Sequence, residues 1–126
     1  MQIKQIINLT PHEVKFHGER GITQYPPEGM VARVGMSAQA EWSVWVGAGE
    51  KRFKTRPTPK GTINLPAPIE GVFYIVSSMV REANPHRLDL LSPSDLVRDE
   101  KGNVIGCKSF DTNYLTAPVE YGGHGI

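Results

Sequence analysis

The stretch from Tyr74 to Phe110 concentrates the side chains that suit recognition of an anionic nucleotide. The apolar run Gly71 to Val76 predicts a buried strand, and the short helix expected after it would offer backbone amides to an anion. Guanidinium groups bind phosphate, an asparagine amide suits a ribose or a base edge, and an aromatic ring stacks on a purine. The candidate ligand-binding residues are Tyr74, Arg81, Asn84, Arg87, Arg98, Asp99, Lys108 and Phe110.

Each of these residues also has an ordinary structural explanation. Arg81 can be a solvated surface residue, and Arg98 can pair with a nearby acid. Phe73, which adjoins Tyr74, can belong to the core. These alternatives stay open at the level of the sequence.

A second group of cations lies in the segment Lys51 to Arg56. If this segment is a strand, Arg52, Lys54 and Arg56 share one face, because side chains alternate along a strand. Such a stripe is a possible phosphate-binding surface. The alternative is a solvated edge strand whose charges prevent aggregation.

The sequence contains no recognised catalytic or metal-binding motif. G-x-S-x-G, H-E-x-x-H and G-x-x-x-x-G-K-[ST] are all missing, so we predict no catalytic residues, no metal and no cofactor. The histidines His12, His17, His86 and His124 form no dense ligand pattern and are expected to be polar loop residues. Cys107 lies in an apolar strand pattern, where a buried packing cysteine is commoner than a nucleophile.

Composition and charge limit the classes of function. The chain has 126 residues, a formal net charge of +1 and one cysteine. A nearly neutral chain is not a general DNA or membrane-surface binder, and we expect neither partner. The sequence has no apolar run of membrane-spanning length and no signal peptide, and a lone cysteine makes no internal disulfide, so a cytoplasmic location is predicted.

Glycine and proline are abundant, with 13 and 10 residues, which favours short strands and turns. Strands are expected over Ile3 to Leu9, Val14 to Phe16, Met30 to Met36 and Gly71 to Val76. Two hairpins are expected, one joining Ala40 to Val46 with Glu50 to Thr55, the other joining Leu96 to Arg98 with Val104 to Lys108. Ser77 or Ser78 should cap a short helix that ends near Asn84, before Pro85. The four-proline segment Arg56 to Pro68 is expected to be an extended surface connection.

The predicted fold class is α+β: a mostly antiparallel β-sheet with one or two short helices, in a single compact domain over residues 1–126. Residues 118–126 are expected to form a flexible tail, or one that is ordered only in an oligomer.

Four elements of the chain, in this order, resemble a group of phage proteins. They are IINLTPHEV, PPEGMVARV, GVFYIVSSMVREA and RLDLLSPSDLVRDEKGNVIGCKSF. Together they are similar to the first type of Thoeris anti-defence protein, over about Ile6 to Phe110. The segment from Ser37 to Pro68 does not carry the resemblance, and its role is not predicted.

The resemblance implies a phage immune-evasion sponge in the cytoplasm of the infected bacterial host. Such a protein sequesters glycocyclic ADP-ribose without degrading it, and some members also bind cyclic di- or trinucleotides. It also implies a homo-oligomer, a dimer or a hexamer, with pockets between protomers. Tyr74, Asn84 and Arg98 match the residue types of the family's pocket, and the match leaves any carry-over to Arg52 or Arg56 in doubt.

Two other functions compete with the sponge. The first is a phage structural or protein-interaction module without a small-molecule ligand, which the proline-rich loops and the glycine-rich tail fit. The second is a nucleotide-processing enzyme with an unfamiliar site, which the missing motifs disfavour.

Overall fold

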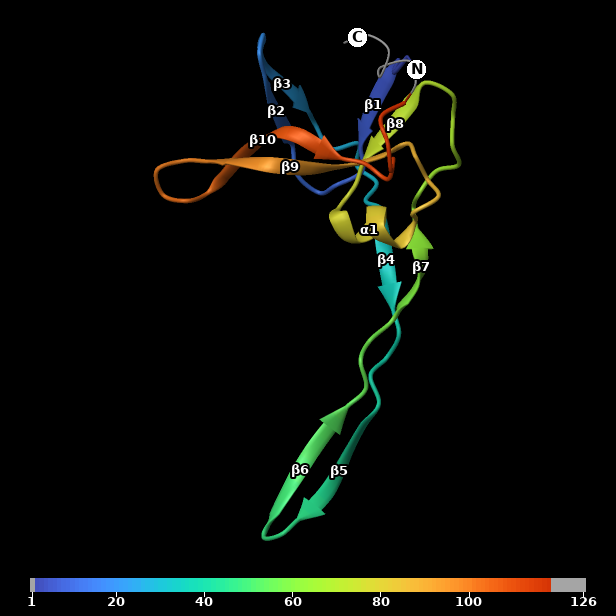
Figure 1. The fold of residues 1–126 in the computed structure, drawn as a ribbon, viewed down its shortest axis with the longest axis vertical. Helices are drawn as coiled ribbons and strands as arrows, with labels where there is room; N and C mark the ends of the chain where they lie inside the picture. Colours follow the sequence, from blue (N-terminus) through green and yellow to red (C-terminus); the bar gives the residue numbers. More distant parts are fainter. Residues whose placement is uncertain (1, 119–126) are drawn as a thin grey trace.

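The computed structural model describes residues 2–118 and consists of a β-sheet body with a long projecting arm (Figure 1). The elements in chain order are β1 (Gln5–Asn8), β2 (Val14–Gly18), β3 (Gly21–Tyr25), β4 (Arg33–Met36), β5 (Glu41–Val46), β6 (Gly49–Lys54), β7 (Pro59–Ile63), β8 (Val72–Ile75), α1 (Ser78–Ala83), β9 (Leu90–Arg98) and β10 (Val104–Asp111).

The body is a six-stranded sheet with the order β1-β8-β9-β10-β2-β3, and it is nearly closed into a barrel. A bridge between Asn8 and Pro27 brings the two edges of the sheet together. Three strand pairs of this sheet are parallel, namely β1–β8, β8–β9 and β10–β2. The near closure leaves little free edge on the body.

The predicted α+β class is wrong, because residues 2–118 are nearly all β, with 49% strand and 5% helix. The expected sheet was also mostly antiparallel, whereas three of its five pairings are parallel. Only α1 forms among residues 2–118, with six residues and one buried side chain, Val80. A helix this short is a connection between strands rather than a layer of the fold.

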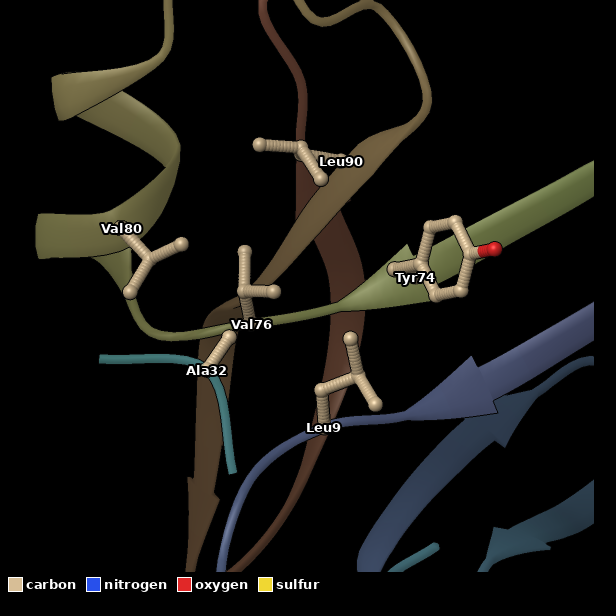
Figure 2. Close-up of a cluster of buried hydrophobic side chains, with 6 residues drawn as sticks. All are labelled: Leu9, Ala32, Tyr74, Val76, Val80 and Leu90. Carbon is tan, nitrogen blue, oxygen red and sulfur yellow. The ribbon is translucent and has the colours of Figure 1, made fainter. Parts of the chain in front are cut away.

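Strand β8 supplies the core on both of its faces. Tyr74 and Val76 join Leu9, Ala32, Val80 and Leu90 on one side (Figure 2). Phe73 and Ile75 pack with Leu91 on the other side. The prediction of a buried central strand is therefore confirmed, since β8 lies between β1 and β9.

The expected helix boundaries are confirmed. Ser77 is the N-cap, and its hydroxyl accepts a hydrogen bond from the amide of Val80 at 3.2 Å. Asn84 is the C-cap, directly before Pro85, which disfavours helical geometry in the preceding residue.

Both predicted hairpins are confirmed, and two strands, β3 and β7, were missed. Strands β5 and β6 pair across Gly47 and Ala48, and β9 pairs with β10. Within the segment expected to be a plain connection, β7 pairs with β4. The prolines of this segment do not prevent the pairing of β7 with β4, because each strand of a two-stranded ribbon has one edge without a partner strand. A proline that would direct its missing N–H to that edge loses no hydrogen bond of the ribbon.

Strands β4 to β7 form the arm, which we define as residues 33–63. The ribbon β4–β7 leaves the body beside α1 and continues into the ribbon β5–β6, whose turn is the end of the arm farthest from the sheet (Figure 1). At roughly 3.3 Å per residue, the strands reach on the order of 40 Å from Arg33. The predicted tail over 118–126 lies, beyond residue 118, outside the described residues.

Candidate functional site

The predicted stacking residue, Tyr74, lies in the core. Its side chain is 2% exposed, among Leu9, Val76 and Leu90 (Figure 2). The register pairs Tyr74 with Leu90 at the start of β9, and Arg98 lies eight residues farther along the same strand. That separation is on the order of 25 Å at a strand's rise per residue. One chain therefore does not bring Tyr74 and Arg98 into a common pocket.

Arg81 and Arg87 are held by polar groups of the body. Arg81 donates from Nε to the Ser92 hydroxyl at 2.8 Å and from Nη1 to Oδ1 of Asn113 at 3.1 Å. Arg87 makes a bidentate pair with Asp89 at 2.9 and 2.8 Å. This hydrogen bonding raises the pKa of Arg87 above its ordinary value. In the described chain both guanidinium groups fasten elements of the fold together.

Asn84 and Asn113 close the C-terminal end of α1. The Asn84 amide donates to the Thr62 hydroxyl and to the Val80 carbonyl, both at 2.8 Å. The Asn113 amide lies 3.0 Å from the carbonyl oxygen of Arg81, 2.9 Å from that of Asn84 and 3.1 Å from that of Arg87. It thereby satisfies carbonyl groups that the end of a helix leaves without partners. Sequence reasoning missed Asn113, because a lone asparagine in a loop carries no local signal of this role.

Replacing Asn113 by alanine should lower the free energy of unfolding by about 2 kcal/mol, because it leaves part-buried carbonyl groups unsatisfied. Urea unfolding followed by circular dichroism measures the loss. Lys101→Ala, in the exposed β9–β10 loop, should change it by less than about 0.5 kcal/mol. Equal effects of the two substitutions would contradict a structural role for Asn113.

Arg98 and Asp99 organise the turn between β9 and β10. Arg98 donates to the Gly102 carbonyl at 2.9 Å. The Asp99 carboxylate accepts from the amides of Lys101 and Asn103, both at 2.9 Å. Backbone hydrogen bonds, that of Asn103 foremost, lower the pKa of Asp99 below its ordinary value. Both residues form an exposed loop rather than a pocket.

Phe110 and Lys108 lie in two further parts of the body. Phe110 stacks on Phe16 with ring centroids 5.4 Å apart and meets Tyr25 edge-on at 6.4 Å. Lys108 lines a hollow of about 550 Å³ beside the β2–β3 turn, together with Arg20. The predicted ligand-binding residues thus lie in the core, around the end of α1 and along β9–β10, and they do not form one site in the single chain.

Cys107 is a packing residue rather than an exposed nucleophile. Cys107 is fully buried, as expected of a packing residue, and burial raises the pKa of its thiol. A thiol that stays protonated at neutral pH is a poor nucleophile. Within residues 2–118 no cluster of three metal-ligating side chains occurs, and no helix is long and apolar enough to cross a membrane.

The arm carries the largest exposed aromatic side chains that the structure describes. We define the arm tip as residues 41–54, the hairpin of β5 and β6. Its register pairs Trp42 with Phe53, and these rings stack with centroids 5.7 Å apart. Because side chains alternate along each strand, one face of the tip, which we call the apolar face, holds the apolar side chains of Trp42, Val44, Val46 and Phe53, with Lys51 opposite Val44 as its one charged residue. These apolar side chains are 41–56% exposed.

The opposite side of the tip, which we call the charged face, holds Glu41, Ser43, Trp45, Glu50, Arg52 and Lys54. Here Oε2 of Glu41 lies 3.3 Å from Nη2 of Arg52, and Oε1 lies 3.5 Å from Nζ of Lys54. The predicted common face of Arg52 and Lys54 is confirmed, while Arg56 lies beyond the end of β6. The two cations share a carboxylate, which weakens their attraction for phosphate.

No family model, curated protein or solved structure matches this chain. The likeness to Thoeris anti-defence proteins therefore stays a prediction. The function has to be argued from the geometry of the chain itself.

Proposed function

We propose that this protein is a non-catalytic protein-interaction module that holds its partner with the apolar face of the arm tip. The observation that carries the proposal is the exposure of Trp42, Val44, Val46 and Phe53 on one side of a ribbon that projects from the body. Exposed apolar patches rimmed by polar residues mark interaction sites. Aromatic residues are also the usual anchors of protein interfaces.

The shape of the arm supports the same conclusion. A two-stranded ribbon is at best marginally stable in water, because it lacks a layer that covers its apolar side chains. Both buried clusters of the protein lie in the body, and none of their fully buried members belongs to the tip. The tip adds nothing to the core of its own chain, and contact with another molecule would explain why it is kept.

Binding of glycocyclic ADP-ribose is a separate prediction, and the single chain gives it limited support. Tyr74 is buried, and Arg81 and Arg87 already hold groups of the body. A nucleotide pocket would have to form between protomers, as the family resemblance implies. Calorimetric titration, followed by heat release of the bound molecule, distinguishes capture from turnover.

Two tryptophan substitutions three residues apart test the proposed function. Trp42→Ser removes the largest side chain of the apolar face and should weaken association by roughly 30-fold, as loss of an interface anchor does. Trp45→Ser removes a more exposed ring, 75% against 49%, from the charged face, and should change association by less than about threefold. Sedimentation velocity or copurification with the partner measures both.

Equal losses in the two variants would contradict an interface on the apolar face. In solution dilute enough to dissociate the wild type, the Trp42→Ser protein has to unfold at the same urea concentration as the wild type, because its effect is expected on binding alone. Both tryptophans of the chain lie in the tip, so intrinsic tryptophan fluorescence reports directly on whether the tip becomes covered.

A further inference from the structure

The body has a largely apolar groove that none of residues 2–118 fills. The groove lies between β2 and the β9–β10 hairpin and has a volume of about 340 Å³. Its exposed apolar side chains are Leu96, Val104 and Ile105, which are 43–51% exposed. Val14, Pro93 and Cys107 also line it, and Glu13 and Lys15, which pair with each other at 3.9 Å, form its charged side. The chain thus has two separate unpaired apolar surfaces, one projecting and one hollow.

Electric charge is divided unequally between the arm and the rest of the chain. The arm holds six of the 14 Lys and Arg residues and two of the 13 Asp and Glu residues. It is therefore cationic, while the remainder has more carboxylates than cations. Two arms repel each other, whereas an arm is attracted to the remainder of a second copy.

The geometry prevents the arm from filling the groove of its own chain. The arm leaves the body beside α1 and runs away from the sheet, and the β9–β10 hairpin projects in a different direction (Figure 1). An arm tip that enters the groove therefore has to come from another molecule. A two-stranded ribbon is stable only when another surface covers it, so its partner has to be present wherever the folded chain is present. A second copy of the same chain always fulfils this requirement.

We infer that the partner of the arm tip is a second copy of this chain, with the apolar face of one copy seated in the groove of the next. The inference rests on the proposed function and adds the identity of the partner and its receiving surface. The contact joins two different surfaces, so it is heterologous and produces a ring or a chain of copies. Trp42 is the side chain that the groove would cover.

A mixing experiment with two full-length variants tests the inference. The arm variant is Trp42→Ser/Phe53→Ser, which keeps an intact groove. The groove variant is Leu96→Lys/Val104→Lys, which keeps an intact arm and places cations where the cationic arm should dock. Both groove positions are about half exposed, so the fold should tolerate lysine there. Ile22→Lys, on an exposed position outside the groove, is the control for the added charge.

Each variant alone should be monomeric by native mass spectrometry and sedimentation, while the Ile22→Lys protein should associate like the wild type. An equimolar mixture of the arm and groove variants should give a 1:1 heterodimer, because one intact arm meets one intact groove.

Three results would overturn the inference. A groove variant that associates like the wild type would show that the arm binds another surface, and the proposed function would stand without this partner. A mixture that stays monomeric would exclude the heterologous contact. A wild-type protein that stays monomeric at about 200 μM, a concentration typical of weak association, would exclude a second copy as the partner.

Discussion

Replacing Tyr74 by alanine should lower the free energy of unfolding by about 4 kcal/mol, nearly a thousandfold in the folding equilibrium. The ring is 2% exposed and belongs to the larger core cluster, so its loss leaves a cavity between β8, β9 and the segment after β1. Urea unfolding followed by circular dichroism measures the effect. Phe53→Ala is a matched control, since it truncates an aromatic ring that is 44% exposed, and it should cost far less.

Tyr74→Phe keeps the measurement informative if the alanine variant does not fold. It keeps the ring and removes only the hydroxyl, so it should cost less than about 1.5 kcal/mol. A loss below about 1 kcal/mol in Tyr74→Ala would contradict the position of the ring in the core.

The same experiment decides how a binding result at this position has to be interpreted. Loss of nucleotide binding in Tyr74→Ala would follow from loss of structure alone, whether or not the ring touches a ligand. Arg98→Ala is more informative for the predicted pocket, because Arg98 lies in an exposed turn and its removal leaves the core intact. Binding that survives Arg98→Ala would remove that residue from the pocket.

The sequence predicts local features of this protein well. The alternation of side chains along a strand placed Arg52 and Lys54 on one face of a predicted hairpin, and the register agrees. The serine before α1 and the Asn-Pro step after it set the helix boundaries. These features depend on neighbouring residues only, so the local pattern contains the necessary information.

Long-range pairing is what the sequence did not predict. The parallel pair of β1 and β8 joins residues more than 60 positions apart, and the sequence of neither strand indicates which other strand it pairs with. The pair of β4 and β7 was missed because prolines made residues 56–68 look like a connection. The sequence could not show where the candidate ligand-binding residues lie, for a related reason. Arginine and asparagine suit both ligands and buried networks, and only the tertiary contacts of Asn113 and Asp89 show which groups hold them here.

Removing the outer part of the arm should abolish association and leave the body intact. Ser37 and Thr58 face each other across the ribbon, with the Ser37 amide donating to the Thr58 carbonyl at 2.8 Å. Replacing residues 38–57 by Asn-Gly therefore closes a two-residue hairpin of the type that strand twist favours. The free energy of unfolding should change by less than about 1 kcal/mol, because neither core cluster includes a residue of the deleted segment. Sedimentation velocity should show a monomer.

The shortened protein also tests which surface receives the arm. It keeps the groove lined by Leu96, Val104 and Ile105, so it can accept an arm but cannot offer one. Added in excess to the wild type, it should cap the wild-type arm and convert larger assemblies into 1:1 pairs. If the shortened protein associates by itself, the arm is not the contact. If it is monomeric but fails to cap the wild type, the arms bind each other, which requires their apolar attraction to exceed the repulsion between two cationic ribbons.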